Sequence, residues 1–312
     1  MNAAVAPCAM AIAYALDAAF GEPPDFAHPV AWIGRAIARG GDWALRAERV
    51  GQRVRGGVVA LAIPTLSAAI AWTATKAVER SPAITVIVVA LLLKPTFAAR
   101  ALRDAAFAVR DALARGDVGG ARRALGSLCS RKTEGLDAEA LTAATIESVA
   151  ENTSDSVVAP LFFFVCFGVP GAVFYRATNT LDAMIGYHGR YEYAGKASAR
   201  LDDVLNFIPA RITALLLLFS GAILGADSRR GIRILRRDAA RTESPNAGRP
   251  MAAMAGLLGV RLVKEEHYAL GDAHEALTPA TISRAWRIAS VASLAAFALA
   301  GVATFALESL RE

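Results

Sequence analysis

Several stretches of this 312-residue chain are apolar over the length that crosses a lipid bilayer. A membrane-spanning α-helix needs roughly 20 consecutive apolar residues. Because lipid offers no hydrogen-bond partners, a spanning segment must satisfy its own backbone groups, which favours helices. The runs that fit are residues 56–78, 82–99, 207–226 and 286–307, with a shorter run at 3–20 and a broken one after Pro160. We therefore expect an all-α, polytopic helical membrane protein with about five to six membrane segments and cytoplasmic helical loops.

The overall composition agrees with this interpretation. Hydrophobic residues make up 55% of the chain, charged residues 20%, and the mean hydropathy is +0.39, which is too apolar for an ordinary soluble domain. We expect one membrane-embedded domain over residues 1–312. The three cysteines, Cys8, Cys129 and Cys166, lie far apart without CxxC spacing. They are expected to be small buried hydrophobes, with neither a disulfide nor a zinc site.

Basic residues are concentrated in two segments. Residues 28–56 carry six arginines against two acidic residues, a formal +4, and residues 229–241 carry six arginines against Asp238, a formal +5. In a membrane protein such segments stay on the cytoplasmic side. The net charge of +6 therefore indicates orientation and contact with anionic lipid, and we expect no nucleic-acid partner. Lys94 is expected to extend its ammonium group to the membrane surface.

Three carboxylates, Glu147, Glu151 and Asp155, follow one another at steps of four residues. On an α-helix they fall on one stripe, where like charges repel by a few tenths of a kcal/mol per pair. No lysine or arginine lies between them, and Asp137 is placed to cap their helix. The stripe is suited to a divalent metal, a proton or a positively charged substrate. A solvated acidic helix face explains the pattern equally well.

A second polar cluster lies just before the run 207–226. Asp202, Asp203 and Asn206 are spaced to share one face of a helix. Asn179 and Asp182 are also three residues apart. Buried or membrane-adjacent Asp and Asn side chains cost several kcal/mol unless a partner satisfies them. We therefore expect a functional role for this cluster.

Two other features leave alternatives open. Asp17 is either a stray charge at the membrane interface or a site residue. The apolar segment after residue 160 is broken by Gly168, Pro170 and Gly171. It is either one kinked span or a hairpin that re-enters on the same side.

The loop TESPNAGRP could bind an anion through donors of Ser244, Asn246 and Gly248, or it could be a simple surface turn. Residues 189–197, GRYEYAGKA, lack the spacing and the Ser or Thr of a P-loop. Any nucleotide site must therefore be of another type.

The motifs occur in an order that resembles one family. DAAFGEPP with HPVAWIGR, ESVAENTSDSVVAPLF, ATNTLDAMIGY, ARLDDVLNFIPARI, and SPNAG with AGLLGV follow one another over nearly the whole chain. The chain is similar to the adenosylcobinamide-phosphate synthase family, the CobD/CbiB cobalamin biosynthesis proteins. The resemblance implies a multi-pass enzyme of the bacterial inner (cytoplasmic) membrane. It implies ATP-dependent ligation of aminopropanol, or its O-phosphate, to a side-chain carboxyl group of adenosylcobyric acid, giving adenosylcobinamide (phosphate).

The resemblance also implies cofactors, partners and site residues. ATP and Mg²⁺ would be required, the corrinoid and the amine would be the substrates, and association with other late cobalamin-pathway enzymes is expected. Catalysis would fall to Glu147, Glu151, Asn152 and Asp155, with Glu151 and Asp155 as metal ligands. The expected substrate-binding residues are Asp17, His28, Asn179, Asp182, Tyr187, Arg200, Asp202, Asp203, Asn206, Arg211, Ser244 and Asn246.

This chemistry agrees with the residue types. A carboxylate and an amine at neutral pH form a salt, so the acid must be activated, commonly as an acyl phosphate, and Mg²⁺ neutralises the triphosphate. Asp182, Asp202 or Asp203 could bind the ammonium group or take its proton. Phosphates or the corrinoid carboxyl group could be met by Arg190, Arg200 and Arg211.

Two positions depart from the family pattern. Lys132 stands where an acidic or amide residue is usual, and RLVKEEHY follows AGLLGV where a Gly-Gly turn is usual. An ion-coupled transporter, which would also use intramembrane acids, is the alternative function. Its polar residues should lie in the middle of spans, whereas here most flank them. A non-catalytic sensor on the same scaffold would be expected to lose the acidic clusters.

Topology adds a further expectation. If six full spans end near residues 20, 78, 99, 175, 226 and 307, both basic segments lie inside but residues 179–206 fall outside. A bilayer cannot divide one active site, so we expect the polar loop to fold back into a protein-lined cavity. Asp155, Asp182 and Asp203 would then line one cavity open to the cytoplasm.

Overall fold

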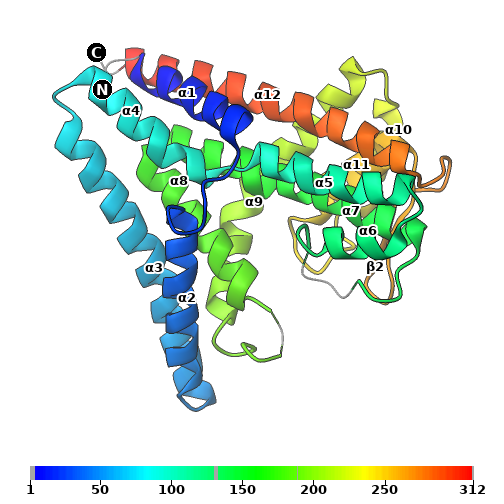
Figure 1. The fold of residues 1–312 in the computed structure, drawn as a ribbon, viewed down its shortest axis with the longest axis horizontal. Coiled ribbons are helices and arrows are strands. Elements are labelled where there is room, and N and C mark those ends of the chain that lie inside the picture. The colour runs from blue at the N-terminus through cyan, green and yellow to red at the C-terminus, as the bar shows by residue number, and fades with distance from the viewer. Residues whose placement is uncertain (1–3, 130–132, 188, 311–312) are drawn as a thin grey trace. The chain divides into compact units, whose positions relative to one another are not determined.

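The computed structural model describes residues 4–129, 133–187 and 189–310, and these are almost entirely helical (Figure 1). The expected all-α fold is confirmed. The exception is a two-stranded antiparallel hairpin of β1 (Leu262–Lys264) and β2 (Tyr268–Leu270). This hairpin is the segment RLVKEEHY that departs from the family pattern, and Glu266 adopts φ 61° in its turn. The other departure, Lys132, lies outside the described residues.

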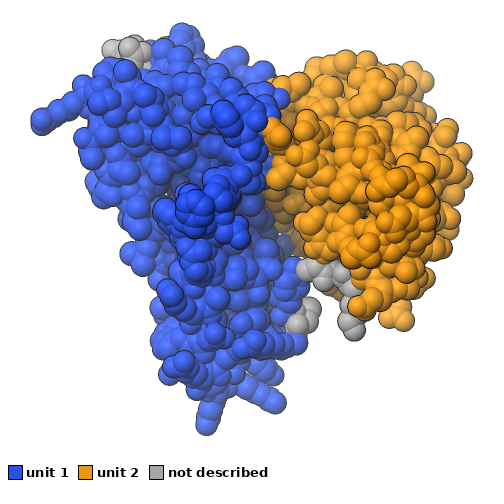
Figure 2. Space-filling model, viewed as in Figure 1, with its two compact units in different colours: residues 1–98, 159–206, 297–312 blue, residues 99–158, 207–296 orange. Residues whose placement is uncertain are grey.

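The described residues form two compact units, each assembled from separate segments of the chain (Figure 2). Unit 1 comprises residues 1–98, 159–206 and 297–312. Unit 2 comprises residues 99–158 and 207–296. The expectation of a single domain over the whole chain stays a prediction.

Unit 1 is built from apolar helices. It contains α1 (Val5–Phe20), α2 (Pro29–Leu45), α3 (Arg49–Val78), α4 (Pro82–Leu93), the 3₁₀ turn η1 (Lys94–Thr96), α8 (Ala159–Ile185), the beginning of α9 (Lys196–Ile223) and the end of α12 (Pro279–Ser309). Proline stands in the first turn of α2 and of α4, where its missing N–H costs nothing. Ile37, Val59, Leu181 and Ile185 form a buried cluster that packs α2, α3 and α8 together.

Helix α8 is a hairpin of two helical halves. Gly168 has φ 66° and ψ −161°, a conformation that favours glycine, and Pro170 stands at the start of the second half. The rings of Phe163 and Tyr175 stack with their centroids 5.2 Å apart, whereas twelve residues of straight helix would separate them by about 18 Å. A Cβ on Gly171 would lie 2.5 Å from the Phe163 carbonyl oxygen. The chain therefore turns back at Gly168, as in the hairpin alternative, and re-entry on the same side of the membrane stays a prediction.

Unit 2 surrounds a buried helix. It contains α5 (Ala99–Ala114), α6 (Val118–Leu125), α7 (Ala138–Thr153), the π-helical η2 (Ser154–Val158), α10 (Ser228–Asp238), α11 (Gly248–Leu258), the β1–β2 hairpin and the remaining parts of α9 and α12. Helix α7 is buried along most of its length and packs on α5, α6, α11 and β1. Helices α10 and α11 approach each other closely where glycine faces glycine. A Cβ added to Gly256 would lie only 2.8 Å from the Gly231 Cα.

Five helical stretches are long and apolar enough to cross a membrane. They are Arg49–Val78, Pro82–Ala114, Ala138–Ile185, Lys196–Ile223 and Pro279–Ser309, and Val5–Phe20 is a shorter apolar helix. The predicted multi-pass helical architecture is confirmed. Three starts were placed too late, at residues 56, 207 and 286. The helices begin at Arg49, Lys196 and Pro279. The second polar cluster therefore belongs to the same helix as the apolar run 207–226.

Two expectations about single residues are wrong. Cys8 and Cys166 are exposed rather than buried, because they lie on the outer faces of the apolar helices α1 and α8, and Cys129 is half-buried. All three are free thiols, as expected. Lys94 does not reach the surface: it is 7% exposed, and its ammonium group pairs with Asp17 and Glu22.

Candidate functional site

The predicted acidic stripe lies in unit 2. Asp137 caps α7 by accepting a hydrogen bond from the Ala140 N–H at 2.8 Å, as expected. On α7, Glu147 is buried and Glu151 is half-buried, whereas the half-buried Asp155 belongs to η2. From Ser154 the α-helix gives way to a π-helix, which has more residues per turn. Asp155 is therefore rotated about the helix axis relative to the two glutamates. Such π-helical turns occur frequently at functional sites.

Asn152 links α7 to this wider turn. Its Nδ2 donates to the Ser148 carbonyl oxygen at 3.0 Å, and its Oδ1 accepts a hydrogen bond from the Ser156 hydroxyl at 3.4 Å. Asn152 thus links the Ser148 backbone to the Ser156 side chain, and these two residues flank Glu151 and Asp155. Its position is compatible with the catalytic role expected for it and also with a positioning role.

Unit 2 also holds two arginines close together. Arg211 of α9 and Arg249 of α11 are near enough for their charges to repel. Arg211 donates to the Phe207 carbonyl oxygen, and its guanidinium carbon lies 3.4 Å from the centroid of the Phe207 ring. The Nε of Arg249 is buried and has no hydrogen-bond partner within the described residues. Two adjacent cations with an unsatisfied donor are suited to an anion.

The loop before Arg249 is folded inward. Asn246 is 4% exposed, and its backbone N–H donates to the Ser244 hydroxyl at 3.3 Å. The Gly248 N–H donates to the Thr242 hydroxyl at 3.1 Å, so it is already used within the loop. The loop leads into α11, which packs on α7, the helix that carries Glu147 and Glu151. The acidic stripe and this loop therefore belong to helices in contact with each other.

The second polar cluster forms a hydrogen-bonded network in unit 1. The two oxygens of Asp202 accept hydrogen bonds from the side-chain amides of Asn206, at 2.8 Å, and Asn179, at 3.4 Å. The Asn206 carbonyl oxygen accepts a hydrogen bond from the Tyr175 hydroxyl at 2.8 Å. Arg176 donates to Asn179 at 3.5 Å. Residues of α8 and α9 that were expected to share a site are thus brought together.

Two more carboxylates lie beside this network. The charge of Asp182 acts on Asp202, and the charge of Asp203 acts on both. Within the described residues, no lysine or arginine forms an ion pair with Asp182 or Asp202. A group of like charges in a largely buried setting is stabilised by a cation, such as an ammonium group or a proton. Tyr187 is 49% exposed in the loop after α8, and Arg200 is exposed on α9.

Asp17 and His28 belong to a separate ion-pair chain in unit 1. The Lys94 ammonium group lies 3.0 Å from Asp17 and 2.8 Å from Glu22, and Glu22 in turn lies 2.8 Å from the His28 Nε2. The His28 Nδ1 accepts the Val30 N–H at 3.1 Å and caps α2. Asp17 is 1% exposed, so it is not a stray interfacial charge. Buried ions remain stable only when paired in this way.

The described residues contain no group of three or more His, Cys, Asp or Glu side chains arranged to hold a metal ion. Mg²⁺ commonly takes one or two protein carboxylates and completes its shell with water and phosphate oxygens. Glu151 and Asp155 are oxygen donors of the right class and are half-buried rather than enclosed. The donor set therefore fits Mg²⁺ bound together with a phosphate.

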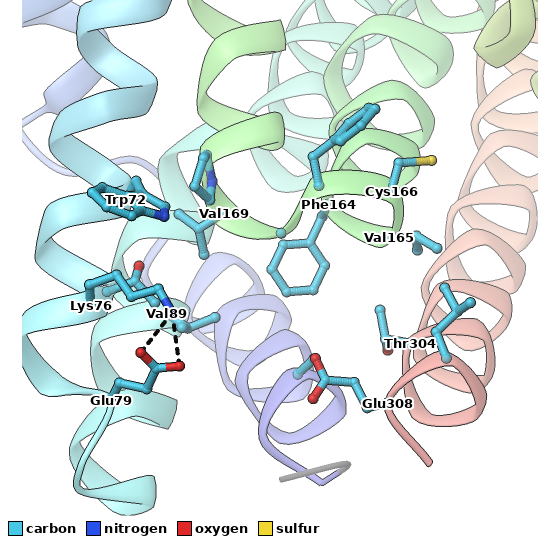
Figure 3. Close-up of a pocket in the computed structure, with 16 residues that line it drawn as sticks. Trp72, Lys76, Glu79, Val89, Phe164, Val165, Cys166, Val169, Thr304 and Glu308 are labelled. Carbon is cyan, nitrogen blue, oxygen red and sulfur yellow. Dashed lines mark hydrogen bonds and ion pairs between the residues drawn. The ribbon is translucent and has the colours of Figure 1, made fainter. Parts of the chain in front are cut away.

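A cavity of about 420 Å³ lies elsewhere in unit 1 (Figure 3). Trp72 and Lys76 of α3, with Glu79 just after that helix, lie across it from Phe164 and Val169 of α8, and α12 supplies Thr304 and Glu308. None of the expected site residues lines it. It lies about 40 Å along α3 from Arg49, at the end of the helix opposite the basic segment.

Several contributing residues were missed from the sequence. Tyr175 was taken as the end of a span, although an aromatic hydroxyl near a polar cluster is a recognisable signal. Arg249 was passed over as part of a turn. The ion pair of Glu22 and Lys94 joins residues 72 positions apart, so no local sequence pattern indicates it. Such pairs cannot be found by reading local spacing.

Comparisons with known proteins agree with the motif order. Residues 10–303 match the family model described as CobD/Cbib protein. The chain is 44% identical over 274 residues to "Cobalamin biosynthesis protein CobD" of Dehalococcoides mccartyi, covering 87% of this chain and 89% of that protein. It is 38% identical over 304 residues to the protein of the same description in Klebsiella pneumoniae, covering 93% and 95%. No solved structure matches the chain.

Proposed function

Since the chain belongs to the CobD/CbiB family of cobalamin biosynthesis proteins, we propose that it catalyses an ATP-dependent amide ligation. The amine is aminopropanol or its O-phosphate, and the acid is a side-chain carboxyl group of adenosylcobyric acid. The product is adenosylcobinamide or its phosphate. The enzyme works in the bacterial inner (cytoplasmic) membrane, in contact with lipid and with other late enzymes of the same pathway.

The buried Asp202 network is the observation that carries the assignment of the amine site. Asp202 is held by the neutral amides of Asn179 and Asn206, and the charges of Asp182 and Asp203 act on it. Neutral donors satisfy the carboxylate without neutralising it, so its charge remains available to an ammonium group. One of these aspartates then accepts the proton that the amine must lose before it can attack a carbonyl carbon.

The activation of the carboxyl group is assigned to unit 2. Glu151 and Asp155 would hold Mg²⁺, which when bound neutralises charge on phosphate oxygens. Arg211, Arg249 and the inward-folded loop of Ser244 and Asn246 bind and orient anionic groups, either phosphate or the corrinoid carboxylate. Glu147, buried on α7, is the third carboxylate of the stripe and takes part in catalysis with Glu151, Asn152 and Asp155. Asp17 and His28, through their contacts with Lys94 and Glu22, position α1 and α2.

Product analysis tests this function directly. Purified protein in detergent is incubated with adenosylcobyric acid, aminopropanol phosphate and Mg-ATP, and the corrinoids are analysed by mass spectrometry. We expect a product whose mass equals the sum of the acid and the amine minus one water, formed only when ATP is present. An unchanged corrinoid, with both phosphorylated and free amine, contradicts the proposal.

A further inference from the structure

A basic pocket lies in unit 1, and none of the residues that line it belongs to the hydrogen-bonded network of Asp202. The pocket has a volume of about 320 Å³ and is lined by Arg53, Tyr193, Lys196, Ala197 and Arg200. Three of these five residues are cations, and no Asp or Glu is among them. Within the described part of the chain, none of the three cations has an ion-pair partner. The surface of this pocket is therefore strongly positive.

An aromatic ring holds part of this charge in place. The guanidinium carbon of Arg53 lies 5.3 Å from the centroid of the Tyr193 ring, and that of Arg49, one turn earlier on α3, lies 5.5 Å away. Cation–π contacts of this kind orient a guanidinium group while leaving its N–H donors available at the edge. Arg49 thus adds a fourth positive charge beside the pocket.

The backbone around the pocket is fixed by two close approaches. A Cβ on Gly56 would collide with the Ala194 carbonyl oxygen, so α3 touches the backbone of the α8–α9 connection. A Cβ on Gly195 would collide with the carbonyl oxygen of Ile185, which closes this connection onto the end of α8. Arg190 and Asp42 add an ion pair at 3.1 Å. The cations therefore converge on a built surface rather than on a loose loop.

Several cations that line one pocket favour an anion between them, because its charge offsets theirs. We propose that Arg53, Lys196 and Arg200, with Tyr193, form a binding site for a phosphate-bearing anion. Guanidinium and ammonium groups are the usual partners of phosphate, and Arg can bind it through two parallel hydrogen bonds. The inference goes beyond the proposed ligation, because it requires no turnover and shares only Arg200 with the expected substrate site.

Two sources of phosphate fit this chemistry. The pocket lies at the basic end of α3, where a membrane-spanning helix meets lipid headgroups, so an anionic lipid is one source. A soluble phosphate compound in the adjoining aqueous phase is the other. The two are distinguished by offering each of them separately.

The first measurement uses sodium pyrophosphate as the probe. Binding to the full-length purified protein is followed by titration calorimetry at low ionic strength. We expect binding by the wild type and about tenfold weakening in each of Arg53→Gln, Lys196→Gln and Arg200→Gln. Arg53→Lys should weaken binding less than Arg53→Gln, because it keeps the charge but loses the two parallel hydrogen bonds. The matched control is Arg46→Gln, which removes an exposed charge from the same unit outside the pocket. Raising the salt concentration should weaken binding in the wild type.

The second measurement uses spin-labelled phosphatidylglycerol in nanodiscs of phosphatidylcholine. If lipid is the source, the label is enriched around the wild type, less enriched around the three Gln variants, and unchanged around Arg46→Gln. Either pattern supports the site and identifies its source. The proposal is overturned if neither probe binds, or if Arg46→Gln loses as much as the pocket variants. Neither measurement depends on product formation. A failure to bind phosphate would therefore leave the proposed ligation untested, and a failure of the ligation assay would leave the phosphate site untested.

Discussion

At the scale of single residues, Asp202 shows how an acidic side chain is kept inside an apolar helix. Its oxygens accept hydrogen bonds from Asn206 and Asn179, and Asn206 is itself held by the buried hydroxyl of Tyr175. All of these donors are neutral. An arginine in their place would have cancelled the charge that a cationic substrate needs.

The first prediction concerns this aspartate and its neighbour. Asp202→Asn and Asp203→Asn should each raise the KM for the amine about tenfold or more, because each removes a charge that the ammonium group meets. Corrinoid affinity should change less than twofold. Steady-state kinetics with the amine varied, together with corrinoid titration, measure both quantities. Asp25→Asn, an exposed aspartate in the same unit, is the control. An unchanged amine dependence in both variants would refute the assignment.

The second prediction concerns the proposed metal ligands. Glu151→Gln and Asp155→Asn should lower amide formation at least about a hundredfold, because a neutral amide cannot compensate the charge of Mg²⁺ and phosphate. Membrane insertion should be normal. Product is measured by mass spectrometry and insertion by membrane fractionation. Glu139→Gln, an exposed change in the first turn of α7, should keep full activity. Normal turnover by well-folded variants would contradict the metal assignment.

The third prediction concerns Asp238, which lies outside the candidate spans. Burial raises the pKa of the Asp238 carboxyl group. Hydrogen bonds from Arg237 and from the Gly271 N–H, each at 2.8 Å, lower it, as do the positive charges of Arg237 and Arg241. The net result is a pKa below the ordinary 3.8. A lowered pKa in the folded state means that this carboxylate stabilises the protein above pH 3.8. That stabilisation is lost as the pH falls through the folded pKa.

Asp238→Asn should therefore lower the free energy of unfolding by about 1–3 kcal/mol at neutral pH, because the neutral amide loses the charge-assisted hydrogen bonds from Arg237 and the Gly271 N–H. Its stability should also fall less steeply than that of the wild type on acidification below pH 4. Thermal unfolding in detergent across pH gives both results. Asp272→Asn, whose side chain is 42% exposed, should cost no more than about 1 kcal/mol. Parallel acid profiles for the wild type and Asp238→Asn would contradict this account.

At the scale of elements, glycine contacts decide how helices approach one another. Gly56 and Gly57 are adjacent on α3, yet a Cβ on Gly56 would strike the backbone of Ala194 and a Cβ on Gly57 would meet nothing within 4 Å. Helix α3 can therefore lie directly against the α8–α9 connection only on the Gly56 side. The same contact holds the basic pocket together.

The fourth prediction follows from this pair. Gly56→Ala should destabilise the protein by about 1–3 kcal/mol and weaken pyrophosphate binding, since the α8–α9 connection must shift to accept the methyl group. Gly57→Ala should be neutral or stabilising by up to about 1 kcal/mol, because alanine is the better helix former. Thermal unfolding of the two variants side by side provides the measurement. Equal stability of both would show that the close approach at Gly56 is not a constraint.

At the scale of the whole molecule, the α8 hairpin changes the topology argument. The expectation of six full spans rested on Tyr175 ending a crossing, and the hairpin at Gly168 removes that premise. In unit 1 the α8–α9 connection lies against the N-terminal end of α3, through Arg190–Asp42 and the contact at Gly56. If the basic end of α3 is cytoplasmic, this polar connection is cytoplasmic as well. The orientation of residues 229–241 and the shared cavity of Asp155, Asp182 and Asp203 stay predictions.

The fifth prediction tests this orientation. A cysteine at Ala183 or Ala199 should be labelled only from the cytoplasmic side, and one at Arg80 only from outside. Because Cys8 and Cys166 are exposed, all three native cysteines must be replaced first. Membrane-impermeant maleimide applied to intact cells and to inverted vesicles distinguishes the two sides. Efficient labelling of Ala183→Cys in intact cells would refute a cytoplasmic site.

Local patterns by themselves determined a large part of this protein. Apolar runs of membrane length predicted the helices, Asp137 predicted the start of α7, and the spacing of Asp202 and Asn206 predicted that they share a face. These features depend on interactions between residues that are close in the sequence, so they can be predicted from residue type and spacing.

Other features were decided only by tertiary structure. Lys94 pairs with Asp17 and Glu22 across the fold, although its position near the end of an apolar run indicated a lipid-facing role. The π-turn at Asp155, the hairpin at Gly168 and the basic pocket of Arg53, Lys196 and Arg200 likewise join distant or locally ambiguous residues. The physical reason is the same in each case. Packing selects among local conformations of similar energy, and a charge finds its partner through space rather than along the chain.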